Sequence, residues 1–105
     1  MNTKAKIYIY SIENIIDGIP NGLDVRLYTK YEDAKAKLLS ELESNKRIEN
    51  CREEYRYDKD VDIHEQPPLS GSWIFDSPIM YVRTVSENRM IYSRTIRSIF
   101  EKDLN

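Results

Sequence analysis

The chain has 105 residues, the usual size of a single folded domain. Its 16 Lys and Arg side chains stand against 18 Asp and Glu, a formal net charge of −2. This balance excludes a general polyanion binder, because phosphate-driven affinity needs a strongly basic surface. A hydrophobic content of 40% excludes a disordered tail. We therefore expect residues 1–105 to form one domain.

Cysteine content and the length of apolar runs predict the compartment. Cys51 is the sole cysteine, so no intramolecular disulfide can form, as is typical of a reducing compartment. The apolar runs are far shorter than the roughly 20 residues that cross a bilayer. The basic start MNTKAK leads into no apolar signal segment. We expect a cytoplasmic protein without a membrane partner.

The first expected elements form a β-hairpin. KIYIYSIENII (6–16) is β-branched and aromatic, which favours a strand with Ile7 and Ile9 on one side and Tyr8 and Tyr10 on the other. The turn-rich segment DGIPNG (17–22) predicts a long loop. LDVRLYT (23–29) alternates strictly and predicts a strand with its apolar side chains inward, namely Leu23, Val25 and Leu27.

The next segment, 31–47, has the spacing of an amphipathic helix. Thr29 followed by Glu32 matches a capping box, which predicts Thr29 as the N-cap. The apolar stripe of the helix consists of Tyr31, Ala34, Leu38 and Leu42, widened by Leu39.

The second half of the chain contains two ambiguous segments. Residues 48–60 fit either a loop or a helix extension leading to a strand near 60–65. QPPLSGS (66–72) breaks the pattern, and 73–85 is expected to be extended and interrupted at Pro78. A turn is expected at 86–89 and a strand at 90–100, although a helical stripe also fits the latter. The prediction is an α+β fold of order β-β-α-β-β-β, with one helix on one face of a mainly antiparallel sheet.

The segment DKDVDIHEQPP (58–68) is the candidate metal site in the sequence. Asp58, Asp60 and Asp62 match the first ligands of a calcium loop, but Ile63 and Leu69 stand where that loop needs glycine and glutamate. Strand alternation explains the pattern better, with the acids and His64 on one solvated face. No metal is expected.

Candidate catalytic groups are few. A Cys–His dyad would require Cys51 and His64, and nothing beside Cys51 indicates an activated thiolate. The motifs of serine hydrolases, nucleotide phosphate loops and dinucleotide-binding folds are absent from the sequence. We expect a protein that is not an enzyme and needs no cofactor.

Tyrosine and charge patterning favour a binding function. The i,i+2 pairs Tyr8–Tyr10 and Tyr55–Tyr57 can display rings on one strand face, or can simply pack within the sheet. Segment 49–65 is acidic, whereas segment 79–102 is basic. Such polarity suits recognition of a partner by electrostatic complementarity. The simpler alternative is that the basic segment meets segment 49–65 of its own chain or of a neighbouring copy.

Two function hypotheses follow. The first is a non-enzymatic protein-binding domain, a regulator or inhibitor of the kind that phages and mobile elements carry. It would dock on a protein, for example a nucleic-acid-handling enzyme, through an acidic, tyrosine-bearing surface of Tyr55, Tyr57, Asp58, Asp60 and Asp62. The alternative is a nucleic-acid binder that uses the sheet tyrosines with Arg83, Arg89, Arg94 and Arg97. An unpaired edge strand would also permit a homodimer.

Overall fold

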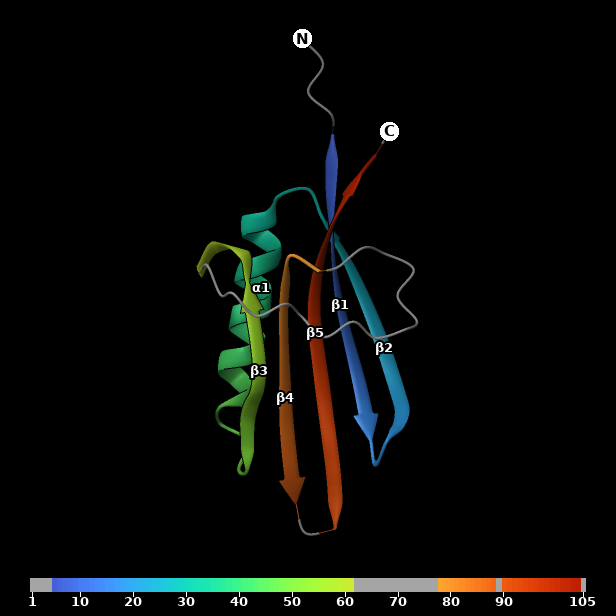
Figure 1. The fold of residues 1–105 in the computed structure, drawn as a ribbon, viewed down its shortest axis with the longest axis vertical. Helices are drawn as coiled ribbons and strands as arrows, with labels where there is room; N and C mark the ends of the chain where they lie inside the picture. Colours follow the sequence, from blue (N-terminus) through green and yellow to red (C-terminus); the bar gives the residue numbers. More distant parts are fainter. Residues whose placement is uncertain (1–4, 62–77, 89, 105) are drawn as a thin grey trace.

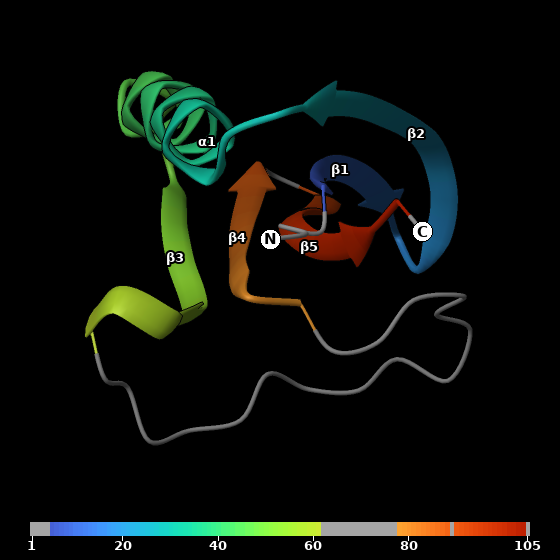
Figure 2. The same ribbon diagram turned by 90° about the horizontal axis from the view of Figure 1, so that it is seen from above.

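The computed structural model describes residues 5–61, 78–88 and 90–104. Their elements form one five-stranded antiparallel sheet and one helix (Figure 1). Along the chain they are β1 (Lys6–Ile16), β2 (Ile19–Tyr28), α1 (Tyr31–Asn45), β3 (Cys51–Asp58), a short 3-10 turn η1 (Lys59–Val61), β4 (Met80–Asn88) and β5 (Ile91–Asp103). The sheet order is β2-β1-β5-β4-β3, and the helix lies on one face of it (Figure 2). The predicted α+β class and element order are confirmed.

The side chains of strand β1 lie on the two faces of the sheet as predicted. Tyr10 and Ile12 face the helix and belong to its apolar core, and Tyr8 packs against that core. Ile9 points to the opposite face, where it is also buried beside its β5 neighbour Phe100. The sheet therefore carries buried apolar side chains on both faces of its central strands.

The β1–β2 connection is shorter than expected. Only Asp17 and Gly18 form the turn, and both have positive φ values of 51° and 80°, as a two-residue type I′ hairpin turn requires. Pro20 lies within β2, which is possible because β2 is an edge strand and Pro is tolerated there. A register shift opposite Asn14 and Ile15 absorbs one extra residue.

The orientation predicted for β2 is wrong. Leu23, Val25 and Leu27 are 69%, 50% and 63% exposed and lie on the face away from the helix. The register pairs Tyr10 of β1 with Arg26, so Asp24, Arg26 and Tyr28 face the helix side, and of these only Tyr28 packs against the apolar core. Alternation predicts two faces, but the neighbouring strand decides which face the helix covers.

The helix has the predicted apolar stripe but different ends. Its four stripe residues are buried, and Leu39 packs against the same core. The N-cap is Lys30, without a side-chain cap, so Thr29 is not the cap and Glu32 lies one position too early for a capping box. At the other end, α1 stops at Asn45, two residues before the predicted boundary.

The ambiguous segments resolve into strands. Residues 51–58 are β3 and not a helix extension, because they pair along β4 with a bulge near Glu54. The predicted strand at 60–65 is wrong for Asp60 and Val61, which belong to η1. Residues 62–77, including the proline break and His64, lie outside the described residues. The predicted strand at 90–100 is confirmed as β5, and β4 continues through most of the predicted turn to Asn88.

Leu38 lies fully buried at the centre of the helix–sheet core. Leu38→Ala is expected to lower the free energy of unfolding by about 2–5 kcal/mol, because the lost apolar contacts leave a cavity. Denaturant unfolding followed by circular dichroism measures this change. Met90→Ala is the control, since Met90 is 95% exposed and its truncation should change little. Equal effects of the two substitutions would contradict the described core.

Candidate binding surface on the sheet

The acidic residues of the predicted docking surface serve different purposes in the fold. Asp58 is only 2% exposed and faces the helix. Its carboxylate lies 3.2 Å from Lys35 Nζ and accepts the Asp60 backbone N–H at 2.9 Å. Asp60 is more exposed and approaches the same Lys35 Nζ at 2.8 Å. Asp58 therefore joins the end of β3 to α1 and to the first residues of η1.

Lys35 and Asp60 shift each other's pKa. The hydrogen bond to Asp60 raises the pKa of Lys35, against an opposing effect of burial and with a smaller contribution from the Asp58 carboxylate. The same hydrogen bond lowers the pKa of Asp60. Beside them, burial and then the Asp58 and Asp60 charges raise the pKa of Tyr31. The Nζ atom of Lys59 lies 4.3 Å from the centroid of the Tyr31 ring. This region is an ionic link between helix and sheet.

Tyr55 and Tyr57 lie on the other face of β3 from Asp58, because side chains alternate along the strand. Both are half-buried. Asp62 lies outside the described residues. The sequence-predicted set is thus divided: two tyrosines on one face, one buried carboxylate on the other, and Asp60 beside the helix.

The two tyrosines share their face with arginines of the alternative hypothesis. Glu54, in the β3 bulge, is the meeting point: Arg83 Nη2 lies 3.0 Å from its Oε1, and Arg94 Nε lies 3.7 Å from its Oε2. The Tyr92 hydroxyl lies 3.4 Å from Glu54 Oε2 and accepts a hydrogen bond from Arg94 at 3.0 Å. Three strands therefore converge on one carboxylate.

Aromatic contacts extend this cluster. The Tyr55 and Tyr81 rings meet edge to face with centroids 5.8 Å apart, and the Arg83 guanidinium lies 6.0 Å from the Tyr55 centroid. The Arg94 guanidinium lies 5.5 Å from the Tyr92 centroid. The hydrogen bond to Tyr92 and the charge of Glu54 raise the pKa of Arg94. We call this surface the tyrosine–arginine face; it consists of Arg83, Tyr92 and Arg94 around Glu54, with Tyr55 and Tyr57 on the same face of β3.

The remaining predicted arginines do not join this surface. Arg97 is 7% exposed and faces the helix, opposite Val82 and Ile12 in the register. Its Nε and Nη1 atoms have no hydrogen-bond partner among the described residues. Arg89 lies outside the described residues. Contact between the acidic segment 49–65 and the basic C-terminal segment of the same chain was the simpler alternative in the sequence, and Glu54 forms it with Arg83 and Arg94. Neither Glu54 nor Tyr92 was among the predicted site residues, because only the bulge in β3 and the β4–β5 register bring them to these arginines.

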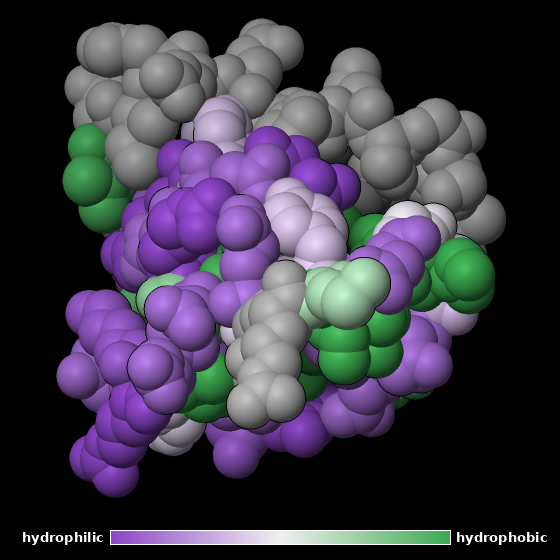
Figure 3. All heavy atoms as spheres, turned by 90° about the horizontal axis from the view of Figure 1, so that it is seen from below, coloured by the Kyte–Doolittle hydropathy of each residue, from purple (hydrophilic) through white to green (hydrophobic). Residues whose placement is uncertain are grey.

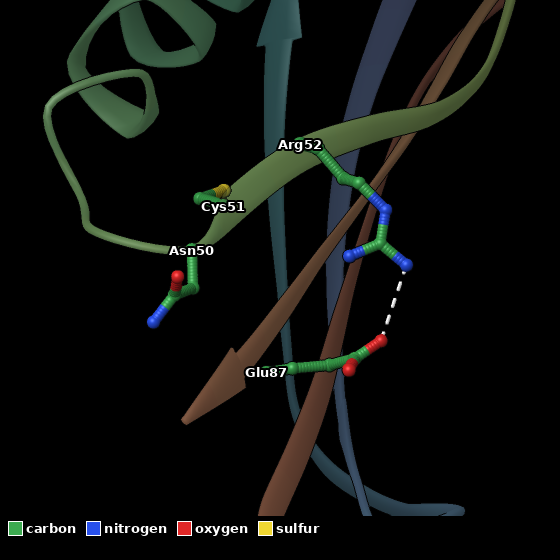
Figure 4. Close-up of a pocket in the computed structure, with 4 residues that line it drawn as sticks. All are labelled: Asn50, Cys51, Arg52 and Glu87. Carbon is green, nitrogen blue, oxygen red and sulfur yellow. Dashed lines mark hydrogen bonds and ion pairs between the residues drawn. The ribbon is translucent and has the colours of Figure 1, made fainter. Parts of the chain in front are cut away.

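A second surface feature is an open hollow of about 510 Å³ near the start of β3 (Figure 4). Its lining residues are Asn50, Cys51, Arg52 and Glu87. Arg52 and Glu87 point toward each other and form an ion pair of 3.1 Å. Cys51 is half-buried with a free thiol. His64, the partner that a Cys–His dyad would need, lies outside the described residues.

Further chemical features are absent from the part of the chain that the structure describes. Residues 5–61, 78–88 and 90–104 contain no group of three or more His, Cys, Asp or Glu side chains placed to hold a metal ion. Within these ranges no helix is long and apolar enough to cross a membrane. No protein-family model, curated protein or solved structure matches the chain.

The role of Asp58 can be tested by truncation. Asp58→Ala is expected to lower the free energy of unfolding by about 1–3 kcal/mol, because buried donors lose their acceptor. Asp60→Ala is the matched control; the Asp60 side chain is 48% exposed and should contribute less than that of Asp58. Chemical denaturation of both variants gives the comparison. If Asp58→Ala leaves the free energy of unfolding unchanged, this carboxylate does not stabilise the contact between β3 and the helix.

Ionisation of the Tyr31 hydroxyl should lower the free energy of unfolding at alkaline pH. Its folded-state pKa is raised above the unfolded value of 10.0, so its contribution is complete below that pH and is lost as pH rises further. Tyr31→Phe keeps the ring and removes a hydroxyl without a hydrogen-bond partner among the described residues. We expect unchanged or higher stability at neutral pH and a shallower loss between about pH 10 and 12. Urea unfolding across this range measures both; identical slopes would contradict the assignment.

Proposed function

We propose that this chain is a non-enzymatic binding domain that docks on another protein through its tyrosine–arginine face. The observation that carries this proposal is the convergence of Arg83, Arg94 and Tyr92 on Glu54. It holds part-exposed aromatic and guanidinium groups in defined positions on a sheet. A regulator or inhibitor that covers a surface of its target fits this description.

Protein recognition is favoured by the kinds of side chain present. Tyrosine and arginine are enriched at the energetic centres of protein interfaces. Arg83 and Arg94 are already held by Glu54 and by ring contacts, so less side-chain entropy is lost on binding. Two guanidinium groups share one carboxylate, which leaves positive charge for an acidic segment of the partner.

Fewer of the predicted acidic residues than of the predicted tyrosines can contact a docked partner. Tyr55 and Tyr57 lie on the proposed surface, and Asp58 is buried beneath the helix. Asp60 remains exposed enough to contact a partner that extends around β3. The proposal therefore rests on the tyrosines and arginines of one face.

Nucleic acid is the second candidate ligand, and a specific observation favours it. Arg83 lies near the Tyr55 ring and Arg94 near the Tyr92 ring, and such ring–guanidinium pairs can stack on unpaired bases. Binding to single-stranded RNA or DNA would weaken steeply as salt rises. A protein complex dominated by tyrosine contacts would depend less on salt.

The test is affinity capture from host lysate, with and without nuclease, using the wild type and Arg83→Gln/Arg94→Gln. A partner bound through this face should survive nuclease and bind the double variant at least tenfold more weakly, as two interface arginines each contribute about 1–2 kcal/mol. The matched control is Lys30→Gln/Lys37→Gln, which removes the same charge at exposed positions before and on α1. Thermal melting confirms that all variants are folded.

Two results would contradict the proposal. Equal capture of the partner by the wild type and the arginine variant would show that the binding site does not lie on this face. A nuclease-sensitive catch, together with salt-dependent binding of single-stranded oligonucleotides, would assign the face to nucleic acid. Arg83→Lys/Arg94→Lys separates charge from planar stacking, because lysine keeps the charge and lacks the guanidinium plane.

A further inference from the structure

The two edges of the sheet differ sharply in character. The β3 edge carries Arg52, Glu53 and Arg56 and has a bulge near Glu54, features that oppose pairing with another strand. The β2 edge pairs with β1 on one side, and no other described strand pairs with its outer side. An edge strand presents a row of backbone N–H and C=O groups with which a further strand can pair.

The β2 edge is also apolar on the face away from the helix. Leu23, Val25 and Leu27 expose 50–69% of their surfaces. Seen from the end of the molecule with the hairpin turns, most atoms in view are hydrophilic, and the larger group of hydrophobic atoms lies to the right of the centre (Figure 3). An exposed apolar stripe on an unpaired edge strand is a site for strand addition.

We propose that β2 pairs with β2 of a second copy of this chain, antiparallel and about a two-fold axis at Val25. The usable length of β2 places this axis. Pro20 cannot donate to a ladder, and the register shift lies just beyond it, so regular pairing is limited to residues 22–28. Val25 is the midpoint of that segment. A two-fold axis at Val25 pairs every residue of the segment 22–28 with a residue of the second copy, and an axis at any other residue pairs fewer of them.

The side chains of β2 are self-complementary in this register. Arg26 lies 3.1 Å from Asp24 and 3.3 Å from Glu41 of its own chain. In the dimer, Asp24 of one copy lies opposite Arg26 of the other, twice, on the helix side of the sheet, which extends these ion pairs across the interface. Leu23 lies opposite Leu27 of the other copy, and the two Val25 side chains meet at the axis. The exposed stripes of both copies thereby join into one apolar band. An unrelated strand would not in general match both the charges and the apolar positions.

The decisive test places a cysteine at the axis. In a Cys51→Ser background, Val25→Cys should form a disulfide-linked dimer on mild oxidation, because opposed strand residues have Cα atoms about 4.5–5.5 Å apart, within disulfide range. Leu27→Cys alone should not cross-link, since its two copies would lie roughly 13 Å apart along the strands. Mixing Leu23→Cys with Leu27→Cys should yield the mixed dimer.

Analytical ultracentrifugation of the otherwise unmodified chain provides an independent measurement. We expect a monomer–dimer equilibrium that shifts at least tenfold toward monomer in Asp24→Arg, which sets like charges opposite each other. Melting curves confirm folding of that variant. A wild type that stays monomeric at high concentration, or cross-linking of Leu27→Cys as efficient as that of Val25→Cys, would overturn the proposal. If the β2 edge binds a different partner instead, the wild type will stay monomeric at high concentration.

Discussion

The pairing of β1 with β5 decides the arrangement of all other elements. The two strands pair along the 11 residues of β1, from Lys6 opposite Asp103 to Ile16 opposite Ser93. Because side chains alternate with a period of two, a slip of one residue would exchange the faces of an entire strand. This register places Tyr10 beside Ile99 under the helix. It joins segments at opposite ends of the chain, and such non-local pairing forms slowly compared with local contacts.

One helix covers only part of one face, so the sheet divides its polar groups between two environments. Toward the helix, Asp58 and Arg97 are buried, and the Asp58 carboxylate is engaged with Lys35. On the opposite face, Arg83 and Arg94 remain part-exposed around Glu54. A carboxylate that is buried and hydrogen-bonded stabilises the fold, whereas part-exposed guanidinium groups beside tyrosine rings can meet a ligand. The same kinds of residue therefore have different roles according to the face on which they lie.

The sheet order separates the two proposed contacts. The tyrosine–arginine face spans β3, β4 and β5, and the apolar edge is β2, on the far side of β1 (Figure 1). Association through β2 would extend the sheet and leave the tyrosine–arginine face of each copy accessible. Two copies of one docking face within a dimer can bind a multivalent partner with higher avidity than either copy alone.

The sequence by itself determined the elements with strong local patterns, namely strand β1 and the buried stripe of α1, and it favoured strand β5 and the α+β order. Hydrophobic periodicity records these directly. Only the tertiary structure decided that Leu23, Val25 and Leu27 face outward, that Asp58 is buried, and that Glu54 joins Arg83 to Arg94. Alternation shows that a strand has two faces without showing which one will be covered. Cross-strand neighbours depend on register and bulges, which arise from pairing between distant segments of the chain.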